Sequence, residues 1–251
     1  FLGSVSKVAM MALGLRFLLS TATLALPAIN TLIVVIASLS MIIGNVLALR
    51  QQNIKRLLAY SSIAHVGLIA AGVLSVTTSG LQGAVIQMFN HGINVVAMFF
   101  MIDLLEKRYG TRWMENLGGV AGQMKTFGVL FLVILLGSVG LPLTNGFIGE
   151  FLLLMGIYQY SPWTAAFAGL TLILGAAYMF RLYRNVFLGD ITDHKMDQGD
   201  SKGRENFIMI PLCVLVIAVG FYPAPLLNIS ASSVQQVLQF FNDHNSMVSG
   251  L

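Results

Sequence analysis

The sequence predicts an all-α polytopic membrane protein with about seven transmembrane helices, one of them discontinuous. Only 10% of the 251 residues are Asp, Glu, Lys or Arg, whereas a typical soluble domain carries about 25%. Hydrophobic residues make up 57% of the chain, and its mean hydropathy is +0.82. Apolar stretches recur that are long enough to cross a bilayer core of about 30 Å, which requires about 20 residues. This composition excludes ordinary soluble enzyme folds and disordered chains.

Seven apolar stretches follow one another along the chain. Their approximate limits are 1–19, 29–49, 57–75, 83–105, 127–158, 163–187 and 207–222. The fifth stretch is too long for one straight helix, and it contains Gly140, Pro142 and Gly146, which disfavour helix. We therefore expect two half-helices around a break at 140–149. Weaker amphipathic spacing over 230–242 predicts a further helix on the surface.

The basic residues collect in alternate connections between these stretches. Twelve of the 14 Lys and Arg lie in three connections, namely Arg50, Lys55, Arg56, Lys107, Arg108, Arg112, Lys125, Arg181, Arg184, Lys195, Lys202 and Arg204. Basic loops of membrane proteins face the cytoplasm, which predicts a multi-pass membrane protein with these loops inside. The location that we expect is the bacterial inner membrane. Binding of nucleic acid or anionic lipid is the alternative account of the charge, but topology explains it more simply.

Few ionisable residues remain within the apolar stretches. Lys7 lies in the first, His65 in the third, His91 in the fourth and Glu150 in the broken fifth. A charge at bilayer depth costs at least about 2.5–3.5 kcal/mol, so such residues face the bundle interior or water and mark ion paths. Lysine, histidine and glutamate can each hold or release a proton in a desolvated site. These four residues are therefore the predicted proton relay.

Polar residues at helical spacing accompany the predicted relay. The supporting residues are Ser61, Ser62, Gln87, Asn90, Asn94 and Pro142. Asn90 and Asn94 share one helix face, and the break at Pro142 frees backbone groups beside Glu150. An interior hydrogen-bonded histidine without a transport role is the alternative account of His65. Arg16, near the end of the first stretch, is expected to extend to the membrane interface.

Three motifs occur in a characteristic order and spacing. They are IKRLLAYSSIAHVG at 54–67, GAVIQMFNHG at 83–92 and GLPLTNGFIGEF at 140–151. Together they resemble the antiporter-like proton-pumping subunits of NADH–quinone oxidoreductase, respiratory complex I. The first motif is also similar to that of Mrp-type cation/proton antiporters and membrane-bound hydrogenases. Glu150 in the third motif resembles the M subunit, because the L and N subunits usually have lysine there.

This resemblance implies an organisation for the chain. The family has fourteen spans in two inverted five-helix repeats, and the sequence is similar to the second half. Residues 1–19 then match the last helix of the first repeat, 20–187 the second repeat, 188–206 a cytoplasmic loop, and 207–251 the final transmembrane helix and C-terminal tail. Because the sequence begins at Phe1 rather than Met, we expect it to be one piece of a longer chain.

The resemblance also implies a function. It predicts proton translocation coupled to NADH oxidation and quinone reduction, by a subunit of an oxidoreductase complex. Lys7 matches the mid-membrane lysine that connects two half-channels, His65 and His91 match the histidines of the central hydrophilic axis, and Glu150 matches the terminal carboxylate. A subunit of an Mrp-type antiporter or membrane-bound hydrogenase is the alternative function, and a purely structural membrane scaffold is a third.

No redox centre or metal site is predicted in this chain. Cys213 is the only cysteine, which excludes an internal disulfide, a four-cysteine zinc site and an iron–sulfur cluster. The resemblance places NADH, flavin, iron–sulfur clusters and quinone in partner subunits. The expected partners are the other membrane-arm subunits, including neighbouring antiporter-like subunits, and the lipid bilayer; nucleic acid is not expected.

Overall fold

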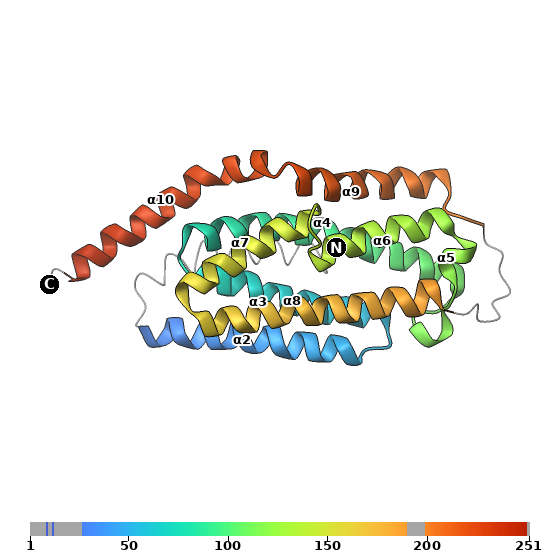
Figure 1. The fold of residues 1–251 in the computed structure, drawn as a ribbon, viewed down its shortest axis with the longest axis horizontal. Coiled ribbons are helices and arrows are strands. Elements are labelled where there is room, and N and C mark those ends of the chain that lie inside the picture. Colours follow the sequence, from blue (N-terminus) through green and yellow to red (C-terminus); the bar gives the residue numbers. More distant parts are fainter. Residues whose placement is uncertain (1–8, 10–11, 13–26, 190–198, 250–251) are drawn as a thin grey trace.

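A computed structural model describes residues 27–189 and 199–249, together with Ala9 and Ala12, and it describes the side chains of 31–189 and 199–241. The described residues form a bundle of antiparallel helices (Figure 1). The elements are α2 (Pro27–Arg50), α3 (Ile54–Leu74), α4 (Thr78–Tyr109), η1 (Met114–Asn116), α5 (Val120–Gln123), α6 (Lys125–Val139), α7 (Asn145–Tyr160), α8 (Pro162–Tyr183), η2 (Arg184–Leu188), α9 (Gly203–Phe221) and α10 (Ala224–Ser249).

Five described helical segments are long and apolar enough to cross a membrane: α2, α3, α4, α8 with η2, and α9. The apolar helix α6 is shorter, and it is continued by α7 (Figure 1). The predicted all-α membrane fold is therefore confirmed. The predicted number of seven helices includes the stretch at 1–19, which lies outside the described residues except for Ala9 and Ala12.

The predicted discontinuous helix is present, but its break is shorter than expected. Helix α6 ends at Val139 and α7 begins at Asn145. Gly140 ends α6 with φ of 72°, and Leu143 within the break has φ of 74°, a region that strains residues other than glycine. Gly146 lies inside α7 rather than in the break. A Cβ there would lie only 2.1 Å from the backbone carbonyl oxygen of Gly137 in α6. This glycine is needed for close packing, not for the turn.

Glycines also bring α4 and α7 into close contact. A Cβ at Gly156 would lie 2.3 Å from the backbone nitrogen of Gly80, and one at Gly83 would lie 2.6 Å from that of Leu153. Small residues at helix crossings are how membrane helices maximise their packing, because lipid supplies little hydrophobic driving force between them. The α4–α7 crossing therefore fixes α7 against the bundle.

The two ends of the bundle differ in their connections. Helices α2, α4 and α8 end, and α3, α6 and α9 begin, at one end of the bundle, on the right in Figure 1, whereas the α3–α4 and α7–α8 connections lie at the other. The α2–α3, α4–α6 and α8–α9 connections are the ones that carry the clustered Lys and Arg of the sequence. We call the first end the basic end, and the other the opposite end.

Two apolar clusters fill the bundle at different depths. The cluster toward the basic end includes Leu57, Met98, Met101, Phe127, Phe131, Tyr178 and Phe187. The cluster toward the opposite end includes Met41, Leu68, Leu81, Ala84, Leu153 and Ile157. Buried polar residues occupy the positions between them on three helices: 61–65 of α3, 87–94 of α4 and 145–150 of α7. These positions form a polar layer at middle depth.

The loop before α9 is held against the basic end by Asp200. Its carboxylate accepts hydrogen bonds from the backbone N–H of Thr126 at 2.8 Å, of Phe127 at 3.2 Å and of Ser201 at 2.7 Å. Burial opposes the charged form, but these hydrogen bonds and one from the Thr126 side chain outweigh it and lower the pKa of Asp200 to about 2. Asp200 thus supplies the negative charge that the N-terminus of α6 favours.

A buried ion pair fixes the start of α9 in the same region. Arg108, near the end of α4, is only 7% exposed. Its guanidinium pairs with Glu205 in the first turn of α9 and also donates to the carbonyl oxygen of Gly199 at 3.3 Å. The described part of the 188–206 loop is therefore docked on the bundle, and not the freely solvated linker that its polar composition indicates.

The C-terminal helix α10 extends beyond the region predicted to be amphipathic. It diverges from α9 and passes over the opposite end of the bundle (Figure 1). Val234 and Phe241 on its apolar face are buried in the cluster at that end, while Ile229 and Phe240 are exposed. The helix therefore packs on the bundle through one face and exposes the other, as an amphipathic helix on the surface does.

Candidate functional site

Helix α3 contributes the first polar side chains of the middle layer. Asn53 caps the helix by accepting a hydrogen bond from the backbone N–H of Arg56 at 3.2 Å. Ser61, Ser62 and His65 then fall within about one turn and are all buried. The middle of this membrane helix therefore directs polar groups into the bundle.

Helix α4 presents the longest polar stripe. Gln87, Asn90, His91 and Asn94 follow each other at helical spacing, and each is less than 9% exposed. This confirms that the stripe faces the protein rather than lipid, as its spacing predicts. In a membrane interior, such groups must find partners within the protein.

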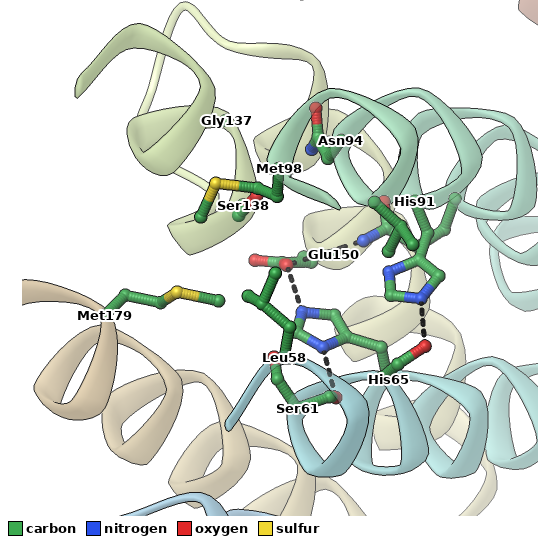
Figure 2. Close-up of a pocket in the computed structure, with 13 residues that line it drawn as sticks. Leu58, Ser61, His65, His91, Asn94, Met98, Gly137, Ser138, Glu150 and Met179 are labelled. Atoms are coloured by element: carbon green, nitrogen blue, oxygen red, sulfur yellow. Dashed lines mark hydrogen bonds and ion pairs between the residues drawn. The ribbon is translucent and has the colours of Figure 1, made fainter. Parts of the chain in front are cut away.

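Glu150 comes from α7, one and a half turns after the helix break. It is 4% exposed. One of its carboxylate oxygens lies against the break, because a Cβ on Gly140 would be 1.9 Å from Glu150 Oε2. The other oxygen, Oε1, faces α3 and α4 (Figure 2). The absence of a side chain at Gly140 is thus what allows the carboxylate to occupy this place.

The centre of the site is the pair of His65 and Glu150. The distance from His65 Nε2 to Glu150 Oε1 is 3.5 Å, and the amide nitrogen of Gln87 lies 3.4 Å from the same oxygen. His65 Nδ1 lies 2.9 Å from the backbone carbonyl oxygen of Ser61. A carbonyl can only accept, so Nδ1 carries hydrogen and Nε2 is the position that gains or loses a proton. The pair can therefore hold one proton on either partner.

His91 extends this pair toward α4. Its ring stacks on that of His65, with the centroids 5.1 Å apart and the planes inclined by 23°. His91 Nε2 forms a hydrogen bond of 2.9 Å with the hydroxyl of Ser62. Figure 2 draws this bond as a dashed line from the ring of His91. Two imidazoles and one carboxylate, each able to hold or release one proton, thus form a continuous series through His65.

A cavity of about 20 Å³ adjoins these groups, which is room for one water molecule. It is lined by polar side chains from the site, among them Ser61, His65, His91 and Glu150, and by apolar ones such as Met98 and Met179 (Figure 2). A water molecule here would have several hydrogen-bonding partners. The arrangement can therefore pass a proton between side chains of different helices through a single water.

Two polar residues of the site were not predicted from the sequence. Tyr178 of α8 donates a hydrogen bond to the hydroxyl of Ser61 at 2.8 Å. Asn145, fully buried at the start of α7, exchanges amide hydrogen bonds of 3.3 Å with Asn94, and its backbone carbonyl accepts one of 2.6 Å from Asn90. Asn145 follows a Gly-Leu-Pro turn and precedes Gly146, so its sequence context indicates a turn rather than a buried clamp.

Lys7 is outside the described residues, and so is Arg16. Pro142 is in the break but is exposed, so its side chain does not contribute to the buried site. Among the residues that the structure does describe, His, Cys, Asp and Glu form no group of three or more that could hold a metal ion.

Comparisons with known proteins agree on one family. The transmembrane family described as NADH:quinone oxidoreductase/Mrp antiporter matches residues 1–175. The chain is 39% identical over 210 residues to NADH-quinone oxidoreductase subunit M of Rickettsia felis, a match that covers 83% of this chain and 43% of that relative. The chain therefore spans less than half the length of the relatives it matches.

Solved structures agree with this result. A chain in respiratory complex I from Thermus thermophilus with bound NADH is similar with a TM-score of 0.76 and 31% identity, over 83% of this chain and 45% of that one. A chain in the Mrp complex from Dietzia has the same fold, with a TM-score of 0.73 and 21% identity over 86% of this chain and 49% of that one. The chain belongs to the transmembrane family of NADH:quinone oxidoreductase and Mrp antiporter subunits.

Proposed function

We propose that this chain translocates protons across the bacterial inner membrane as the second half of an antiporter-like subunit M of respiratory complex I. NADH oxidation and quinone reduction in partner subunits, which hold the flavin and iron–sulfur clusters, supply the energy. The similarity to subunit M supports this assignment, as does the glutamate at position 150. In this proposal residues 1–19, 20–187, 188–206 and 207–251 have the organisation that the family resemblance implies, and the basic end faces the cytoplasm.

The observation that carries the proposal is the buried contact of His65 Nε2 with Glu150 Oε1 at 3.5 Å. A carboxylate at middle depth in a membrane protein is energetically costly, and such residues mark ion paths and proton relays. Here it lies beside a helix break, a stacked pair of histidines and a cavity for one water. Protons pass among Lys7, His65, His91 and Glu150, and they are released toward the opposite end.

Glu150→Gln tests this role, because glutamine retains the size of the side chain but cannot carry the proton. The intact complex with this substitution is compared in membrane vesicles for NADH oxidation, proton pumping and subunit content. We expect coupled pumping to be abolished or sharply reduced while the complex still assembles. Glu115→Gln, which changes an exposed acid in η1, is the matched control and should pump normally. Normal pumping by Glu150→Gln would refute the proposal.

The alternative functions make different predictions. An Mrp-type cation/proton antiporter would purify with other antiporter subunits and without flavin or iron–sulfur proteins. The lower identity to the Mrp chain, 21% against 31% for complex I, favours complex I. A structural scaffold would keep full transport when His65, His91 or Glu150 is neutralised singly.

A further inference from the structure

One buried hydroxyl connects the site to the apolar cluster at the basic end. Tyr178 is a fully buried member of that cluster, yet its hydroxyl donates to Ser61 Oγ at 2.8 Å, and Ser61 lines the cavity beside Glu150. The proposed relay of Lys7, the histidines and Glu150 makes no use of Tyr178. Its ring lies in the apolar cluster on the basic-end side of the site, and its hydroxyl reaches the site itself.

The hydrogen bonds of this connection have a defined direction. The hydroxyl of Tyr178 donates and Ser61 Oγ accepts. A serine hydroxyl has one proton and two lone pairs, so Ser61 keeps its own proton to donate into the cavity that it lines. Both hydroxyls therefore point from the basic end toward the cavity, in the order Tyr178, Ser61 and then Glu150.

Other buried polar groups lie near the basic ends of α8 and α2. Arg181, almost one turn later in α8, donates through its guanidinium to the backbone carbonyl oxygens of Leu49 and Gln51, which lie at the end of α2. Arg181 Nε is buried without a hydrogen-bond partner among the described residues, and so is Oδ1 of the fully buried Asn45 in α2. A buried polar atom without a partner costs about 1–3 kcal/mol, so each of these two atoms favours a water molecule as its partner.

We propose that Tyr178 and Ser61 form a proton inlet from the basic end to Glu150. In each passage a hydronium on the basic-end side gives a proton to Tyr178 Oη. Tyr178 gives its original proton to Ser61 Oγ, and Ser61 gives its own through the cavity water to the Glu150 carboxylate. Each hydroxyl gains one proton and loses one, one water is left behind, and the carboxylate becomes a carboxylic acid. The inlet rests on the proposed function, because Glu150 is its acceptor.

The test uses three substitutions in the intact complex, with proton pumping in vesicles measured at equal complex content. Tyr178→Phe and Ser61→Ala each remove one hydroxyl, and Ser61→Thr retains it. We expect each of the first two to lower the initial pumping rate roughly tenfold or more. The double variant should be no slower than the slower single variant, because the two hydroxyls act in series, and Ser61→Thr should pump faster than Ser61→Ala.

The matched control is Tyr183→Phe. It removes a tyrosine hydroxyl from the same helix, where the hydroxyl donates to the Gly128 carbonyl oxygen at 3.4 Å, and it should pump normally. Normal pumping by Tyr178→Phe would overturn the inlet, and so would independent, multiplicative losses in the double variant. If Tyr178→Phe fails to assemble, equal rates for Ser61→Ala and Ser61→Thr would overturn it instead.

Glu150→Gln, measured in the same series, separates the two proposals. If Glu150→Gln stops pumping while Tyr178→Phe pumps normally, the inlet is wrong and the proposed function stands. If Glu150→Gln itself pumps normally, both proposals are wrong.

Discussion

Gly140→Ala should inactivate proton transfer without changing any polar group. A Cβ at Gly140 would lie 1.9 Å from Glu150 Oε2, so an ordinary contact of 3.4 Å requires the carboxylate to move by about 1.5 Å. The contact with His65 is already 3.5 Å long, and a displacement of 1 Å at a reacting group can reduce a rate about 100-fold. The φ of 72° at Gly140 adds backbone strain of about 1–2 kcal/mol for alanine.

Substitutions at two other glycines separate the effect of the contact with Glu150 from the effect of backbone strain. Gly110→Ala introduces the same backbone strain, since φ is 68° there, but its Cβ would meet nothing within 4 Å. Gly169→Ala in α8 introduces neither strain nor contact. Proton pumping in vesicles, normalised to assembled complex, should fall about 100-fold for Gly140→Ala and remain near normal for both controls. If Gly140→Ala pumps as well as Gly110→Ala, then the position of the Glu150 carboxylate does not control transfer.

The remaining predictions concern the structures that hold the site in place. Asp200→Ala should lower the stability of the purified protein by about 0.5–2 kcal/mol through loss of the α6 cap, as measured by thermal unfolding. Because the pKa of Asp200 is lowered to about 2, the stabilisation should be complete above the ordinary carboxylate pKa and should disappear as the pH falls toward 2; an equal difference between the two proteins at every pH would contradict this. Glu205→Leu should destabilise by about 3 kcal/mol because it removes the anionic partner of the buried Arg108, and the double variant with Arg108→Met should recover part of that loss in the same assay. Gly156→Ala should destabilise by about 1–3 kcal/mol, since its Cβ would lie 2.3 Å from Gly80 N; a melting temperature equal to that of Gly169→Ala would contradict the close crossing of α4 and α7.

Much of the fold follows from simple properties of the sequence. The length of the apolar stretches locates the membrane helices, and Gly140 and Pro142 locate the break. His65, His91 and Glu150 were identifiable because ionisable groups are rare in apolar stretches. The structure brings these three side chains together from three helices. The apolar stretches contain few other ionisable residues, so few other candidates for this site were present.

The residues that sequence reasoning missed are those whose role depends on contacts between distant segments. Tyr178 is 117 positions from its partner Ser61, and a tyrosine in an apolar helix is ordinary on composition alone. Asp200 and Glu205 occur in a polar segment that favours a solvated loop, yet their partners are the start of α6 and the buried Arg108. Neither charge nor spacing predicts such docking, because it depends on where the helix ends meet.

The two apolar clusters on either side of the polar layer also determine how the protein responds to voltage. Low-dielectric material carries most of the fall in membrane potential, whereas a polar layer carries little of it. Moving one elementary charge across the whole membrane requires about 2.3 kcal/mol per 100 mV. If the clusters around Leu57 and Leu68 divide this work equally, a proton does about 1.15 kcal/mol of it per 100 mV between the basic end and the polar layer, and about the same between the polar layer and the opposite end. Uptake and release would then both slow as the membrane becomes energised, and opening one cluster alone would not discharge the membrane.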